Sequence, residues 1–145
     1  MGCSPVKAAL LILMATQAWA VTPQLIEDII QIESSGQANA KGDGGLARGC
    51  AQFHYAAWLD VTSWRKANGL STHTYAKAYD PLIARAYLHS WLTLNAHRFE
   101  DHTGRKPTGA ELYAIHNLGF EGFRKAKFDL AKCPAITRRK AKLIR

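Results

Sequence analysis

A glutamate inside an apolar helical stretch is the first residue in this chain that could do chemistry. Glu33 follows Leu25 and Ile29 at intervals of four residues, so the three side chains share one face of a predicted helix. Burial disfavours a charged carboxylate, and so does the negative end of the helix dipole. Both effects favour a protonated acid at neutral pH, the form that donates a proton in glycoside cleavage. The alternative is that Glu33 points to solvent from a frayed last turn.

Two later segments carry patterns that could complete a site with Glu33. The first is glycine-rich over residues 42–49 and ends in a Gly-x-x-Gln pattern, Gly49 to Gln52. The second is an Ala-x-x-Asn-x-Gly pattern, Ala114 to Gly119. Each pattern alone has little specificity, whereas three in order over most of a chain are more specific.

Glu33-Ser34 and these two patterns, in this order and at these separations, resemble the soluble lytic transglycosylase and goose-type lysozyme family over about Thr22 to Phe123. Members of that family cleave peptidoglycan glycan strands between N-acetylmuramic acid and N-acetylglucosamine. The resemblance implies a mainly α, lysozyme-like domain in which a glycine-rich loop or small hairpin lines the cleft. It implies no metal ion and no organic cofactor.

The resemblance also assigns roles to residues. Glu33 would protonate the glycosidic oxygen, and in the transglycosylase branch its carboxylate then takes a proton from the C6 hydroxyl of the sugar. An anhydro ring closes without water, so one carboxyl suffices where most glycosidases use two. The glycines of residues 42–49 would let the backbone approach the glycan closely. The substrate-binding residues implied are Ser34, Gly49, Gln52, Tyr113, His116 and Asn117.

Two positions depart from the family pattern. His116 stands where many relatives have a tyrosine before the asparagine, and the charge of a histidine depends on pH. Cys50-Ala51 replaces the usual Leu-Met between the glycine and the glutamine of the second motif.

Asp43 leaves the reaction type open. Its separation from Gln52 equals that of the aspartate thought to hold the attacking water in goose-type lysozymes, and a second carboxylate would permit inverting hydrolysis. Aspartate is also common in Gly-Asp-Gly turns, and a further acidic residue of those lysozymes falls at His54. We therefore expect a lytic transglycosylase. The alternatives are a hydrolytic muramidase that uses Asp43 and a non-catalytic wall-binding component of a secretion apparatus.

Charge and length restrict the partners and the domain count. The chain has 145 residues and a formal net charge of +8, which suits one domain that binds anionic partners. A dense basic run occurs only at residues 138–142, unlike many nucleic-acid binders, so no nucleic acid is expected. The expected partner is the peptidoglycan glycan strand, and secretion, conjugation or phage assembly proteins are further candidates.

The first twenty residues have the pattern of a secretory signal peptide. Lys7 precedes an apolar run over residues 8–15 that is too short to span a bilayer, and Ala18-Trp19-Ala20 offers a cleavage site. The alternatives are an uncleaved anchor and a buried helix. Cleavage would leave a domain over residues 21–145 that is exported, periplasmic or secreted, without a transmembrane anchor.

Removal of the signal would also remove Cys3 and leave Cys50 and Cys133 in an oxidising compartment. An even pair there predicts a disulfide that ties the C-terminal tail beside the second motif, with two separate buried thiols as the alternative. The histidines lack zinc-ligand spacing, so no metal site is predicted.

The remaining pattern is that of short helices. Thr22-Pro23 predicts the start of a helix that ends at Gly36, residues 37–49 a loop or hairpin, and residues 50–61 the start of a second helix. The longest helix is expected from Asp80-Pro81 to about His102. Thr108 and Glu111 form a predicted capping box for the helix that carries the third motif. A phenylalanine-rich segment and a short basic helix over residues 136–145 are expected to follow.

Overall fold

The computed structural model describes residues 21–145, so the predicted signal peptide lies outside the described residues. The fold is mainly α, as predicted. Its α-helices are α1 (Pro23–Ser34), α2 (Tyr55–Ala67), α3 (Pro81–Thr103), α4 (Gly109–Leu118), α5 (Phe120–Lys125) and α6 (Ala135–Ala141). A small sheet is formed by β1 (Lys41–Gly42), β2 (Ala47–Arg48) and β3 (Phe53–His54), and 3₁₀ turns cover Asp43–Gly45, Tyr75–Tyr79 and Leu130–Lys132.

The helix starts follow the predicted capping residues. The Thr22 side chain accepts a hydrogen bond from the backbone N–H of Leu25, and that of Asp80 accepts from the first turn of α3. The capping box of α4 is complete, because Thr108 and Glu111 each bind the backbone N–H of the other. These side chains replace the backbone acceptors that the first turn of a helix lacks.

The segment between α1 and α2 differs in part from the prediction. The glycine-rich stretch forms an antiparallel β1–β2 hairpin, and β3 pairs next to β2 with Ala47 opposite His54. The second helix begins at Tyr55, not near residue 50 as predicted. Gln52 adopts a left-handed conformation with φ 51°, and the two residues after it are used in the sheet.

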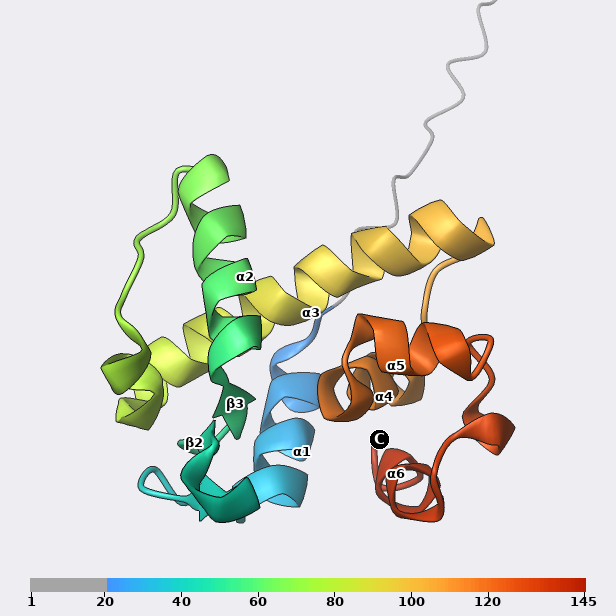
Figure 1. The fold of residues 1–145 in the computed structure, drawn as a ribbon, viewed down its shortest axis with the longest axis horizontal. Coiled ribbons are helices and arrows are strands. Elements are labelled where there is room, and N and C mark those ends of the chain that lie inside the picture. Colours follow the sequence, from blue (N-terminus) through green and yellow to red (C-terminus); the bar gives the residue numbers. More distant parts are fainter. Residues whose placement is uncertain (1–20) are drawn as a thin grey trace, which may run out of the picture.

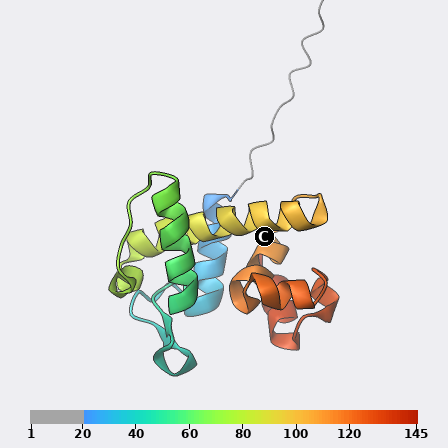
Figure 2. The same ribbon diagram turned by 45° about the horizontal axis from the view of Figure 1, so that its top comes forward.

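Helix α3 connects the two sides of the molecule. Helix α2 and the small sheet lie on one side of α1, whereas α4, α5 and α6 lie on the other; α3 crosses behind α2 and extends above α4 and α5 in the view of Figure 1 (see also Figure 2). Its buried side chains point in several directions, as expected of a central helix. Leu82, in the first turn of α3, is an exception among its apolar side chains and is 79% exposed. No helix among residues 21–145 is long and apolar enough to cross a membrane.

The C-terminal third packs as predicted around phenylalanine residues. Phe99 of α3 contacts the rings of Phe123 and Phe128, and Phe120 also contacts Phe128. Gly119, with φ 74°, allows the chain to turn from α4 into α5. The basic tail then forms α6, which packs against α4.

Candidate active site

Glu33 lies in the last turn of α1 and is largely hidden from solvent. Its side chain is 11% exposed, so the alternative of a solvent-facing glutamate is wrong. The Tyr113 hydroxyl of α4 donates a hydrogen bond of 2.6 Å to Oε1 of Glu33. The Lys140 ammonium of α6 lies 3.4 Å from the same oxygen. Three helices that are distant in sequence therefore meet at this carboxyl.

Tyr113 lies in the interior next to the Glu33 carboxyl and not on an open surface. It is fully buried, although the sequence predicted a substrate contact. Burial, and then the hydrogen bond to Glu33, raises the pKa of the Tyr113 hydroxyl far above its usual value. The phenol therefore stays protonated and acts as a permanent donor to Glu33.

Backbone contacts join the first motif to the second. Ser34 Oγ donates to the Cys50 carbonyl at 2.7 Å, which joins the two motifs. Within the second motif, the side-chain amide of Gln52 donates to the Gly49 carbonyl at 2.9 Å. Gly49 has φ 75°, and a side chain there would collide with the carbonyl of Ala78. Only glycine suits this turn, which begins the Gly-x-x-Gln pattern of this chain.

His116 joins the third motif to the second. Its Nε2 lies 2.8 Å from the Ala51 carbonyl, and because a carbonyl only accepts, Nε2 carries the proton. Burial of the ring lowers the pKa of His116, which keeps the imidazole neutral near pH 7. Its Nδ1 is buried and has no hydrogen-bond partner among the described residues.

Asn117 is oriented by the tail, because its Oδ1 accepts a hydrogen bond of 2.7 Å from Thr137 of α6. Its carbonyl oxygen is thereby engaged, and its amide nitrogen keeps its two donors. Asn117 and Glu33 are therefore both contacted by side chains of α6.

A groove of about 520 Å³ gathers residues of the second and third motifs. Its walls come from α2, α3 and the α4–α5 junction. It is also lined by Trp91, whose buried Nε1 has no hydrogen-bond partner within residues 21–145. Glu33 is not a lining residue, but it interacts electrostatically with His116, which lines the groove. The predicted site residues that line it are Gln52, His116 and Asn117, joined by His54.

Asp43 and His54 form a pair at the edge of the groove. His54 Nε2 lies 2.8 Å from Asp43 Oδ2, and the two side chains are 51% and 69% exposed. Asp43 also makes the expected turn: it has φ 48°, and its carbonyl accepts from the backbone N–H of Leu46. His54, which stands where goose-type lysozymes have a further acidic residue, thus contacts Asp43.

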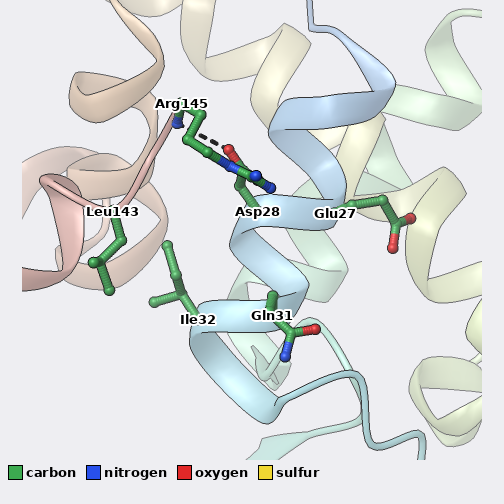
Figure 3. A pocket seen from close by; sticks show the side chains of 6 residues that line it. All are labelled: Glu27, Asp28, Gln31, Ile32, Leu143 and Arg145. Atoms are coloured by element: carbon green, nitrogen blue, oxygen red, sulfur yellow. Dashed lines mark hydrogen bonds and ion pairs between the residues drawn. The ribbon is translucent and has the colours of Figure 1, made fainter.

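A second hollow, of about 490 Å³, lies between α1 and the C-terminal tail (Figure 3). Both of its carboxylates are already paired. Asp28, which is buried, binds Arg145 at 2.9 Å, and Glu27 binds Arg85 at 2.7 Å. Ile32 and Leu143 supply the apolar part of its wall. This hollow offers no unpaired acid, so it is the weaker candidate for an active site.

The predicted Cys50–Cys133 disulfide is not formed in the structure, where both residues are buried free thiols. Each sulfur has its own surroundings: Cys50 Sγ faces the Arg85 guanidinium at 4.0 Å, and Cys133 Sγ faces the Asp129 carbonyl at 3.5 Å. Among residues 21–145, no three His, Cys, Asp or Glu side chains cluster as metal ligands would.

Sequence reasoning missed the contribution of α6. Residues 138–142 stood out only as a basic run, and a charged run at the end of a chain usually covers a solvated surface. No local signal pointed from Lys140 or Thr137 to motifs that lie far upstream. The contact of Tyr113 with Glu33 had a partial signal, since Tyr113 lies one helical turn before His116.

Comparison with protein-family models, with curated proteins and with solved structures found no match. The resemblance to lytic transglycosylases and goose-type lysozymes therefore rests on the three motifs alone.

Proposed function

We propose that this protein is a lysozyme-like enzyme that cleaves peptidoglycan glycan strands, with Glu33 as the acid. The observation that carries the proposal is a largely buried carboxyl, hydrogen-bonded by Tyr113, beside a groove that holds Gln52, His116 and Asn117. A glutamate with only a structural role would require neither an adjacent groove nor contacts among the three motifs.

The contacts of Glu33 suit proton donation. Among the described residues, both polar contacts of the carboxyl fall on Oε1. Oε2 is left to carry the proton to the glycosidic oxygen, and the Tyr113 hydroxyl then stabilises the negative charge that develops on the carboxylate.

Ring closure by the sugar, without water, is the proposed second half of the reaction. Two carboxylates line the groove, and both are paired: Asp60 with Arg98 at 2.7 Å, and Glu121 with Arg124 at 2.7 Å. Neither is a free base, so Glu33 itself would take the proton from the C6 hydroxyl. The product would be a 1,6-anhydromuramyl end, as expected of a lytic transglycosylase.

Hydrolysis is the second candidate, favoured by one observation. The Asp43–His54 pair lies at the groove edge, and a carboxylate that orients an imidazole could activate a water. In that case, products would have reducing muramic acid ends, and Asp43→Asn would abolish cleavage.

The test is cleavage of purified peptidoglycan by Glu33→Gln, which keeps the shape of the side chain but has no acidic proton to transfer. We expect the rate to fall by about 10²–10⁴-fold, the usual cost of losing acid–base catalysis. Glu27→Gln is the matched control, because Glu27 lies on the same helix and faces Arg85 away from Tyr113. Mass spectrometry should find anhydro ends, lighter by one water than hydrolytic ends. Full activity of Glu33→Gln would refute the assignment.

The signal-peptide pattern supports an exported enzyme that meets peptidoglycan in the periplasm or outside the cell. A small enzyme of this kind would suit a secretion, conjugation or phage assembly complex, where limited cleavage of the wall is needed.

A further inference from the structure

Two polar atoms of residues that line the groove are buried without a hydrogen-bond partner. Over residues 21–145, the structure leaves three buried side-chain nitrogen or oxygen atoms unpaired: Trp91 Nε1, Asn95 Oδ1 and His116 Nδ1. Trp91 and His116 line the groove, whereas Asn95 does not. Buried polar groups are nearly always paired in folded proteins, because burial removes the bonds that they make with water. The two unpaired atoms at the groove therefore indicate a place for a ligand.

The two atoms have opposite hydrogen-bonding roles. The indole N–H of Trp91 only donates. His116 Nε2 carries the ring proton because it faces the Ala51 carbonyl at 2.8 Å, so Nδ1 of the neutral ring only accepts. Burial lowers the pKa of His116, which favours this neutral ring near pH 7. Helix α3 thus supplies one donor and helix α4 one acceptor.

The surroundings of this pair favour a neutral ligand with an apolar part. The aspartate, glutamate and arginine side chains that line the groove are all in ion pairs. Phe53 packs edge-on against the His116 ring, with the ring centroids 5.8 Å apart. Further apolar residues of the lining are Ala56, Ala57, Leu118 and Phe120. Both unpaired atoms are covered in the structure, so we expect binding to shift a neighbouring side chain, a common change at interfaces.

We propose that Trp91 and His116 form a binding site for a secondary amide. Such an amide offers a carbonyl acceptor to the indole N–H and an N–H donor to Nδ1 of the imidazole. Its apolar substituents fit the apolar lining, whereas a sugar hydroxyl, which also donates and accepts, brings none. The inference rests on the proposed function for the source of the amide, because peptidoglycan carries secondary amides in the N-acetyl groups of its sugars and in its stem peptides.

Calorimetric titration of the inactive Glu33→Gln protein measures binding without cleavage. The probes are the β-1,4 tetramer of N-acetylglucosamine, the glucose tetramer of the same linkage, and a free stem pentapeptide. The glucose tetramer has a hydroxyl in place of each acetamido group. We expect it to bind about tenfold more weakly than the better of the two amide probes, because it leaves the buried donor and acceptor poorly satisfied.

Two substitutions in this inactive protein each remove one member of the pair. Trp91→Phe removes the donor, and His116→Gln removes the acceptor but keeps an N–H for the Ala51 carbonyl. Each should weaken the amide probe by about 5- to 20-fold and leave the glucose tetramer unchanged. Loss for the N-acetylglucosamine tetramer identifies the acetyl amide as the ligand, and loss for the pentapeptide identifies the stem. Trp64→Phe is the matched control, because Trp64 is also packed against the core but does not line the groove, and it should change no affinity.

NMR tests the same site without relying on a substitution that affects folding. The indole ¹H–¹⁵N signal of Trp91, assigned by its absence in Trp91→Phe, should move when the amide probe is added and stay in place with the glucose tetramer. A signal that responds to neither amide probe, or affinities that fall equally for amide and glucose probes, would overturn the inference. If the amide site behaves as expected but wild-type protein cleaves no peptidoglycan, the proposed function fails while the amide site stands.

Discussion

At the scale of single residues, the site contains two buried hydrogen-bond donors, each with a defined acceptor. Tyr113 keeps its proton and aims it at Glu33, and His116 keeps one proton on Nε2 and aims it at the Ala51 carbonyl. Both groups are held by burial, which opposes the charged form of each. The fixed protonation of these two residues leaves the proposed acid as the group that would transfer the proton.

The lowered pKa of His116 predicts a pH-dependent stability. Between its folded pKa and the usual value of 6.5, the unfolded chain binds the extra proton, so stability rises with pH in this window and is lost as pH falls below about 6.5. Urea unfolding should therefore show a lower midpoint at about pH 5.5 than at pH 7.5. His116→Gln should lose most of this difference.

The pH range in which stability changes distinguishes the contribution of His116 from those of the carboxyl groups. Asp28 and Glu111, whose pKa values are lowered by hydrogen bonds with arginine, lose their contribution only below their usual values of 3.8 and 4.5. An equal loss of stability in wild type and His116→Gln between pH 5.5 and 7.5 would contradict the assignment to His116.

At the scale of elements, α4 is the helix on which the site depends most, since it carries Tyr113, His116 and Asn117. Its start is fixed by Thr108 and by Glu111, which also binds Arg105 at 2.6 Å. We expect Thr108→Ala to lower the free energy of unfolding by about 1 kcal/mol, because the N–H of Glu111 loses its acceptor. Urea denaturation measures the change.

Thr74 provides the matched control for this prediction. It occupies the N-cap of the 3₁₀ turn Tyr75–Tyr79, but its side chain makes no capping hydrogen bond. Thr74→Ala should therefore leave the free energy of unfolding nearly unchanged. Equal effects of the two substitutions would show that the capping bond in α4 contributes nothing.

At the scale of the whole molecule, positive charge is concentrated at one end of the chain. Residues 120–145 contain nine Lys or Arg and two Asp or Glu, a net of +7 within the total of +8. Some of these charges are paired, as Lys140 is with Glu33, whereas Lys125 and Lys127 have no ion pair in the structure described. This end of the molecule is suited to hold an anionic polymer near the groove.

Binding to insoluble peptidoglycan should therefore weaken with salt. Inactive Glu33→Gln, sedimented with peptidoglycan, should be bound less at about 0.5 M NaCl than at about 0.05 M, because salt screens exposed charges. Lys125→Gln/Lys127→Gln should lower binding at low salt and flatten the salt dependence. Lys41→Gln/Lys66→Gln, on the opposite side of α1, is the control with the same loss of charge. Equal salt curves for all three proteins would contradict a role for the C-terminal end.

The sequence alone determined the local features of this protein, because these depend on neighbours a few residues apart. Capping residues predicted where α1, α3 and α4 begin, helical spacing placed Glu33 on a buried face, and glycines marked the hairpin and the turn at Gly49. The start of α2 was predicted too early, because the apolar pattern from residue 50 does not reveal that Phe53 and His54 pair with β2 in the sheet.

Only the tertiary structure decided which groups face Glu33. Tyr113 and Lys140 lie 80 and 107 residues further along the chain, and contacts at that separation follow from how helices pack, which spacing does not encode. The same holds for Cys50 and Cys133, which share a plausible compartment but not a place in the fold. Packing also brought a basic tail that looked like solvated surface into contact with Glu33 and Asn117.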